Sequence, residues 1–165
     1  MIDTTSPELD DTGQRLLRRA IELAALARRN GNTPFGSVLA DPAGNVLAER
    51  QNTVVTERDL SGHPELRLAV WAAHNLTPKE RREATMYTST ENCAMCAAAF
   101  VSAGLGRLVY AVGSADLRRY RGDRQPQPYL DLSSHEVFER ASYPIVVEGP
   151  MLLDEGLAVH EGFWT

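Results

Sequence analysis

His63-Pro64-Glu65 and Cys93-Ala94-Met95-Cys96 are the two stretches that decide the fold of this 165-residue chain. The sequence has two cysteines, and both belong to this one Cys-x-x-Cys pair. One imidazole and two thiolates suit Zn²⁺, and three protein ligands leave a tetrahedral ion one position for water or substrate. We therefore expect His63, Cys93 and Cys96 to bind a catalytic zinc ion, with Glu65 beside it to move protons.

The spacing of these residues also predicts the local backbone. Residues two apart on a helix point roughly 200° apart, so His63 and Glu65 should not both lie inside one helix. Proline favours the first helical position and keeps the preceding residue extended, which places His63 at an N-cap and Glu65 in the first turn. Cys93 and Cys96 share a helix face, and a helix N-terminus stabilises the thiolate that binds metal.

Hydrophobic periodicity divides the rest of the chain into alternating helices and strands. A helix is expected to begin near residues 10–12 and to end at Gly31, and residues 64–75 should form another, with Leu66, Ala69, Val70 and Ala73 as its buried stripe. The remaining expected helices are 94–103, 133–141 and 154–160, and the expected strands are 35–40, 46–49, 85–89, 107–113 and 145–148.

This order predicts an α/β fold, a three-layer α-β-α arrangement with a central five-stranded mixed sheet, in one domain spanning residues 1–165. Both zinc-binding helices follow a strand, so their N-termini should meet at one end of the sheet. Residues 120–130 are expected to form an irregular loop, the kind that serves as a lid or a swap hinge. Residues 150–165 form the C-terminal tail.

His-x-Glu followed by Cys-x-x-Cys resembles the signature of the zinc-dependent cytidine deaminase superfamily, and the chain looks most like the small nucleobase and nucleoside deaminases. That group includes guanine, cytosine and tRNA adenosine deaminases, and the resemblance extends from the first long helix to Val147. It implies a cytidine-deaminase-like fold and hydrolytic release of ammonia by a zinc-bound hydroxide, with Glu65 carrying the protons. Pro64 and Asn92 stand where the family usually has alanine and proline. Neither change removes a metal ligand or the acid/base residue, so we expect them to affect substrate choice rather than the chemistry.

The resemblance also implies four substrate contacts. Asn52 would hydrogen-bond the ring or sugar of the substrate, although an asparagine at a strand end also forms loops. Phe35 would stack near the base, or else be a core side chain. Guanine-deaminating relatives use an acidic residue after the fourth strand and an aromatic residue of the tail, which points to Asp123 and Trp164. A structural role is the alternative for both.

The substrate itself is left open by the sequence. Guanine is the first choice, followed by cytosine, a triazine base or a nucleoside. A tRNA adenosine substrate is disfavoured by a net charge of −5 and a pI near 5.4. Arg118, Arg119, Arg121 and Arg124 form the one dense cluster that could be a local basic patch, although a solvated helix end and loop is the favoured interpretation. A zinc-stabilised binding module without turnover is the alternative from another class.

The cellular setting follows from what the sequence does not contain. Residues 1–11 have no basic region followed by an apolar run, and no segment reaches the length of a membrane span, so neither a signal peptide nor membrane association is expected. Reduced thiols fit the cytoplasm. The expected partners are a small-molecule base or nucleoside and a second copy of the chain, because family members are often homodimers.

Overall fold

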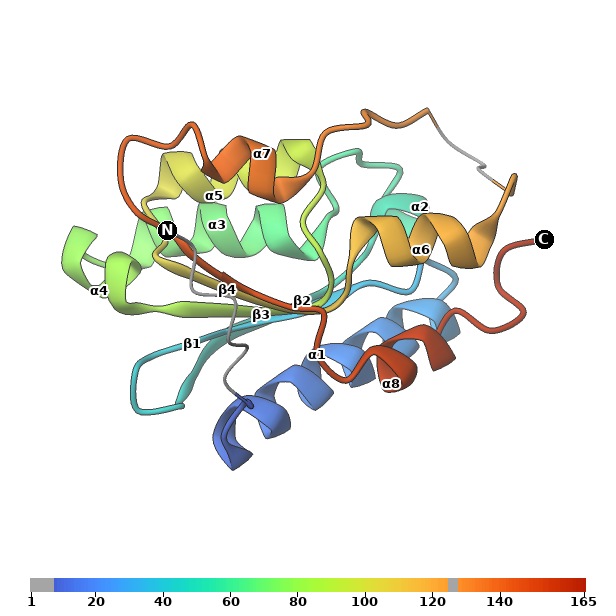
Figure 1. Ribbon diagram of the computed structural model, residues 1–165, viewed down its shortest axis with the longest axis horizontal. Coiled ribbons are helices and arrows are strands. Elements are labelled where there is room, and N and C mark those ends of the chain that lie inside the picture. The colour runs from blue at the N-terminus through green and yellow to red at the C-terminus, as the bar shows by residue number, and fades with distance from the viewer. Residues whose placement is uncertain (1–7, 125–127) are drawn as a thin grey trace.

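The computed structural model describes residues 8–124 and 128–165, and its centre is one five-stranded mixed sheet (Figure 1). The strand order is β2-β1-β3-β4-β5. The prediction of a five-stranded mixed sheet is therefore confirmed. β1 runs antiparallel to its neighbours β2 and β3, whereas β3, β4 and β5 are parallel. The bounds are β1 Gly36–Ala40, β2 Val46–Gln51, β3 Thr85–Thr90, β4 Arg107–Val112 and β5 Val146–Glu148.

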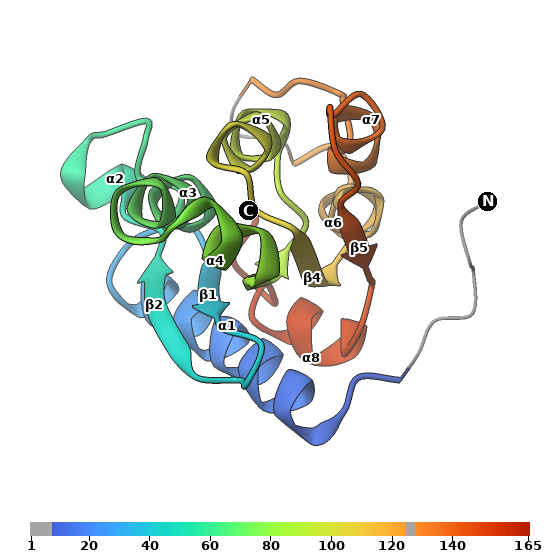
Figure 2. The same cartoon turned by 90° about the vertical axis from the view of Figure 1, so that its left-hand side faces the viewer.

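Helices cover both faces of this sheet, which gives the predicted three layers (Figure 2). One face carries α1 (Asp11–Arg29) and α8 (Leu153–Ala158). The other carries α3 (Pro64–Asn75), α5 (Ala94–Ala103) and α7 (Ser134–Phe138), which lie side by side. Three shorter or peripheral helices complete the described elements, namely α2 (Val54–Glu57), α4 (Pro78–Glu83) and α6 (Ser114–Arg121).

The three central strands are buried on both faces because successive side chains point to opposite layers. Leu39, Met86 and Leu108 pack with α3 and α5, whereas their neighbours Val38, Tyr87 and Val109 pack with α1. The helix α1 approaches the sheet closely at Gly36 of β1. A Cβ there would lie 2.5 Å from the carbonyl oxygen of Ala20, so only glycine lets α1 sit against the start of β1.

The buried stripe predicted for α3 was wrong by one residue. Leu68, Ala69 and Ala72 are buried together with Glu65, whereas Val70 is 51% exposed. The buried set follows helical spacing when Glu65 is counted as its first member. Since Glu65 is polar, hydrophobic periodicity alone placed the stripe on the wrong side.

The sequence also missed the helices α2, α4 and α6. The loop predicted over 120–130 begins later, because residues 120 and 121 belong to α6, and residues 125–127 lie outside the described part of the chain. The helix expected over 133–141 is confined to α7 because Ser133 caps it and the chain turns after Phe138. The C-terminal tail is ordered against the rest of the fold, since it contains α8 and the buried Trp164.

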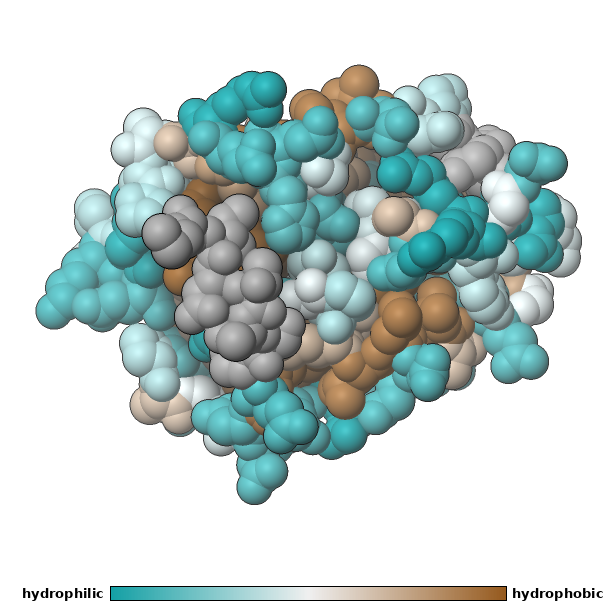
Figure 3. Space-filling view, viewed as in Figure 1, coloured by the Kyte–Doolittle hydropathy of each residue, from teal (hydrophilic) through white to brown (hydrophobic). Residues whose placement is uncertain are grey.

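Among residues 8–124 and 128–165, no helix combines the length and the apolar character needed to cross a bilayer. The surface in the view of Figure 3 is mostly hydrophilic, with a hydrophobic band over α8. Leu153 and Leu157 of that helix are only partly buried, although they pack against the α1 side of the core.

Candidate metal centre

The candidate site lies at one end of the sheet, where β2, β3 and β4 end and β1 begins. Gly36 of β1 pairs with Gln51 of β2, and Ser37 pairs with Thr88 of β3. Thr90 of β3 lies beside Val112 of β4. The loops after β2 and β3 lead into the two helices that carry the predicted metal ligands, so these helix starts meet at the same end of the sheet.

Both helix starts have the backbone that the sequence predicted. His63 is the N-cap of α3 in an extended conformation (φ −73°, ψ 130°), and Pro64 follows at the first helical position. Cys93 is the N-cap of α5, also extended (φ −66°, ψ 167°), and Cys96 lies one turn further. Neither His63 nor Cys93 uses its side chain to cap its own helix. Both side chains are therefore free to point at each other.

The three ligand atoms are spaced as a tetrahedral zinc ion requires. His63 Nδ1 lies 3.8 Å from Cys93 Sγ and 3.5 Å from Cys96 Sγ, and all three atoms lie within 4.8 Å of one another. Typical Zn–S and Zn–N bonds separate tetrahedral ligand atoms by roughly 3.5–3.8 Å. Within the described residues, this is the one group of histidine, cysteine or acidic side chains that gathers so closely. The donor set therefore fits zinc.

The two thiols are electrostatically unequal. A hydrogen bond from Cys96 and a second one with His63 lower the pKa of Cys93 to about 4, against the effect of burial. The pKa of Cys96 is raised well above its usual value, because it is the partner that holds the shared proton and because it is buried. Cys93 is therefore biased toward the thiolate that binds metal, whereas Cys96 has to lose its proton when the metal binds.

Glu65 is buried beside the ligands but is not one of them. Its side chain is 5% exposed, Oε2 lies 3.6 Å from Cys96 Sγ, and Oε1 lies 3.0 Å from the Thr88 hydroxyl. That hydroxyl is also 2.8 Å from Ser37 Oγ. Burial raises the pKa of Glu65 to about 7. A carboxyl group with such a pKa can both accept and release a proton near neutral pH.

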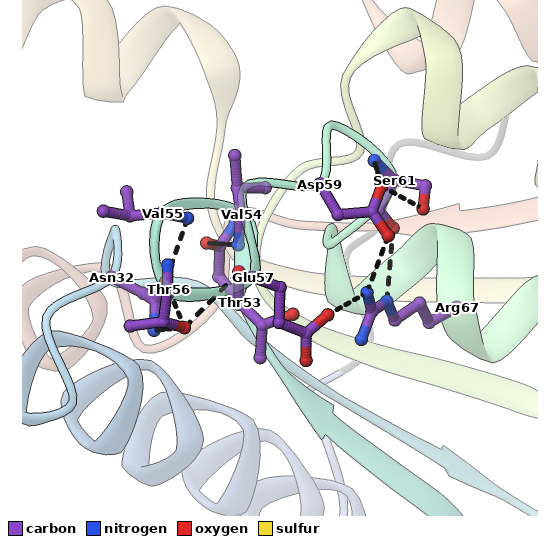
Figure 4. A network of polar contacts seen from close by, with 10 residues as sticks. Asn32, Thr53, Val54, Val55, Thr56, Glu57, Asp59, Ser61 and Arg67 are labelled. Carbon is purple, nitrogen blue, oxygen red and sulfur yellow. Dashed lines mark hydrogen bonds and ion pairs between the residues drawn. The ribbon is translucent and has the colours of Figure 1, made fainter.

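The loop between Asn52 and His63 is held by two side chains from outside it (Figure 4). Asn32 Oδ1 accepts hydrogen bonds from the backbone N–H groups of Val55 (3.1 Å) and Thr56 (3.0 Å). On the other side, Arg67 of α3 forms ion pairs with Glu57 and with Asp59, the latter at 3.2 Å. The loop that joins β2 to His63 is thereby tied to the end of α1 and to α3 itself.

Glu91 holds the other side of the site. Its carboxylate is 9% exposed and accepts hydrogen bonds from Ser114 N (2.8 Å), Ser134 N (3.0 Å) and Ser134 Oγ (2.6 Å). Ser114 and Ser134 are the first residues of α6 and α7, so one buried carboxylate serves two helix N-termini. The sequence did not predict this role, because both serines lie more than twenty residues away.

The structure brings two of the four predicted substrate contacts to this end of the sheet through one backbone bond. Asn52 is 2% exposed, and its N–H donates to the carbonyl oxygen of Phe35 at 2.9 Å. Its Oδ1 accepts from Val54 N at 3.1 Å, which is the loop-forming role weighed as the alternative. Phe35 is half-buried and lies against the C-terminal tail.

Trp164 lies against Phe35, and Asp123 lies in the turn between Arg121 and Arg124, which both contact Trp164. The Trp164 ring is 5% exposed and lies 6.4 Å from the Phe35 ring. Asp123 is exposed in the turn after α6. The residue that the sequence reasoning missed is His160, which is fully buried and stacks on Trp164. Its spacing of four residues from Trp164 was the available signal.

Comparisons with known proteins agree with this geometry. The family model of the cytidine and deoxycytidylate deaminase zinc-binding region matches residues 10–112. A probable cytosine deaminase of Schizosaccharomyces pombe is 35% identical over 163 residues, which are 97% of this chain and 97% of that protein. A tRNA-specific adenosine deaminase of Haemophilus influenzae is 32% identical over 105 residues, covering 64% of this chain and 60% of that protein.

Solved structures show the same fold at lower identity. A guanine deaminase from Nitrosomonas europaea matches with a TM-score of 0.69 and 21% identity, over 95% of this chain and 86% of that chain. A tRNA:A34 deaminase matches with a TM-score of 0.68 and 23% identity, over 88% of this chain and 99% of that chain. The family match, the relatives and the ligand geometry together show that the chain belongs to the zinc-binding cytidine and deoxycytidylate deaminase family and is a zinc-dependent hydrolase that removes an amino group from a nucleobase.

Proposed function

We propose that the protein deaminates a free nucleobase, with guanine as the first-choice substrate, and that Glu65 is its catalytic acid and base. The observation that carries this proposal is the position of the Glu65 carboxyl, which is buried 3.6 Å from Cys96 Sγ and lies outside the group of three candidate ligands. A net charge of −5 further favours a small molecule over a polyanion.

The chain's own residues divide the work. His63, Cys93 and Cys96 would hold the zinc ion, which would supply the Lewis acidity that lets a water molecule lose a proton near neutral pH. Glu65 accepts that proton while the oxygen attacks the ring carbon that bears the amine. Glu65 passes that first proton to the ring nitrogen and then transfers the remaining proton of the added hydroxyl to the departing amine, so that the C–N bond breaks and ammonia leaves as the carbonyl forms. Thr88, 3.0 Å from Oε1, keeps the carboxyl in place for both transfers.

Guanine is favoured by the tail. The resemblance to guanine deaminases implies an aromatic residue of the tail beside the base, and the burial of Trp164 against Phe35 supports that role. Cytosine is the second candidate, supported by the 35% identity with the probable cytosine deaminase of S. pombe over nearly the whole chain. Triazine bases and nucleosides share the reacting amidine edge and belong in the same assay.

Ammonia release by zinc-loaded protein tests the proposal, with guanine, cytosine, adenine, their nucleosides, a triazine and an anticodon-stem RNA as substrates. We expect turnover of one free base and a loss of roughly 10²–10⁴-fold in kcat for Glu65→Gln at unchanged zinc content. Glu83→Gln, an exposed glutamate of α4, is the matched control and should be fully active. Activity on RNA alone would move the protein to tRNA editing, and no release from any substrate would favour the binding module.

A homodimer stays a prediction, which sedimentation equilibrium of the zinc-loaded protein would test.

A further inference from the structure

The C-terminal tail is fixed to α1 and to the end of α6 by contacts from three arginines. Arg28 of α1 donates to the carbonyl oxygens of Val159 (2.9 Å) and Glu161 (2.6 Å). Arg124 donates to the carbonyl oxygen of Trp164 at 2.9 Å, and the Arg121 guanidinium lies 4.5 Å from the centre of the Trp164 ring. The tail therefore runs between the end of α1 and α6 (Figure 1).

These contacts bury a histidine whose tautomer is set by its neighbour. Trp164 Nε1 can only donate, and it lies 3.1 Å from His160 Nδ1, so Nδ1 is the acceptor and the ring proton is on Nε2. Burial, reinforced by the charges of Arg121 and Arg28, lowers the pKa of His160 to about 4. The ring is therefore neutral at physiological pH and carries one N–H donor in a defined place.

That donor has no partner within residues 8–124 and 128–165. His160 is fully buried, and its Nε2 makes no hydrogen bond to any described group. Leaving a buried N–H unpaired is unfavourable, so such a group in a folded protein is normally paired with water or a ligand. The His160 ring lies 5.7 Å from the ring of Phe35, whose carbonyl oxygen accepts from Asn52. The unpaired donor thus belongs to a ring that lies against Phe35 and Trp164, two residues that the family resemblance implies as substrate contacts.

We propose that His160 is a specificity residue whose Nε2–H donates a hydrogen bond to an acceptor on the substrate ring. This inference rests on the proposed nucleobase deaminase function. The amidine edge of the base has to face the metal and Glu65, so the remaining acceptors, a ring nitrogen or a carbonyl oxygen, are available to the protein on the other edges. A neutral donor suits them, because it cannot titrate away near neutral pH and does not attract phosphate as a cation would. Bases with an acceptor at that position are selected over analogues that carry C–H there.

Three variants of the zinc-loaded, full-length protein test the role of His160. His160→Phe keeps an aromatic ring and removes the donor, whereas His160→Gln places an amide N–H near the position of Nε2. His74→Phe, at an exposed histidine near the end of α3, is the matched control. Steady-state ammonia release is measured on whichever base of the panel the wild-type protein deaminates fastest, together with zinc content and thermal unfolding.

We expect His160→Phe to raise KM about 10- to 100-fold, which corresponds to the loss of one hydrogen bond in a buried site, while kcat per zinc changes little. His160→Gln should recover part of this loss, and His74→Phe should behave as wild type. A KM within threefold of wild type in His160→Phe would overturn the inference. So would a loss seen only as inactive protein or missing zinc that His160→Gln does not restore, because that pattern indicates a structural role.

The two proposals fail in different ways. A wild-type protein that releases no ammonia refutes the proposed function, whereas an active wild type with an equally active His160→Phe refutes only the role of His160. If the wild type releases no ammonia, equilibrium dialysis of guanine and cytosine against the wild type and His160→Phe tests whether His160 binds the base. Weaker binding by the variant supports the donor, and equal or absent binding overturns it.

Discussion

Replacing Glu91 with glutamine tests how much its carboxylate contributes to stability by accepting hydrogen bonds at the N-termini of α6 and α7. The substitution keeps the shape of the side chain and removes its charge and one of its two acceptor oxygens. In the structure, Oε2 accepts from Ser114 N and Oε1 accepts from the N–H and hydroxyl of Ser134. A glutamine amide that keeps its oxygen toward Ser134 points its own N–H₂ group at the N–H of Ser114. One buried backbone donor then loses its partner.

The size of the effect follows from these three bonds. Leaving a buried donor unpaired costs about 1–3 kcal/mol, and hydrogen bonds to a charged group are worth about 1.5–3 kcal/mol against about 1 for neutral ones. Since the Ser134 hydroxyl can rotate, we expect Glu91→Gln to lower the free energy of unfolding by about 2–4 kcal/mol. For a chain of this length, that corresponds to a Tm roughly 5–15 °C lower.

Thermal and urea unfolding of zinc-loaded protein measure this difference, and the chain offers a close control. Glu136 of α7 makes the same two kinds of bond, accepting from Ser133 N (2.9 Å) and Ser133 Oγ (2.8 Å), but it is exposed. Glu136→Gln should lower the free energy of unfolding by less than about 1 kcal/mol, because water can accept the hydrogen bond that the glutamine amide cannot. If the two substitutions cost the same, or if Glu91→Gln lies within about 0.5 kcal/mol of wild type, the reasoning about burial is refuted.

Two further predictions concern pH and metal. His160 is neutral in the folded protein with a pKa of about 4, whereas the unfolded chain protonates it near 6.5, so stability should be unaffected above that pH and fall by about 3 kcal/mol between pH 6.5 and 4. Urea unfolding across this range should show the additional slope in the wild type and not in His160→Phe, and identical slopes would contradict it. Chelation should lower the Tm by roughly 10 °C, the effect of removing a ligand present at about 1,000 times its Kd, and added zinc should restore it. An unchanged Tm with the metal verifiably removed would contradict this prediction, because a metal that binds the folded chain and not the unfolded one must stabilise it.

The sequence predicted the metal centre well because its geometry is local. Pro64 determines that His63 is an N-cap, and the spacing of Cys93 and Cys96 puts both sulfurs at the start of one helix. These effects act within four residues, so they could be worked out without knowing the fold. The order of strands and helices then brought the two helix starts together.

The remainder of the site depends on contacts between distant segments. His160 becomes a neutral, oriented donor because Trp164, Phe35 and Arg121 surround it, and apart from its spacing to Trp164 nothing near it in the sequence indicates this. The buried face of α3 was misplaced for a related reason, since Glu65 belongs to that face although it is polar. Hydrophobic patterns locate a core, but they cannot locate a polar group that is buried for its chemistry.

The two sulfurs of the metal centre differ in access, because Cys93 is exposed whereas Cys96 is buried. In metal-free protein, an alkylating or oxidising reagent would therefore reach Cys93 first and leave Cys96 intact. Such damage would remove a single ligand without disturbing the core, giving molecules that keep their fold but no longer take up zinc. The inactive fraction of a preparation would then reflect how long the protein had been without its metal, and purification in the presence of zinc would protect the exposed sulfur.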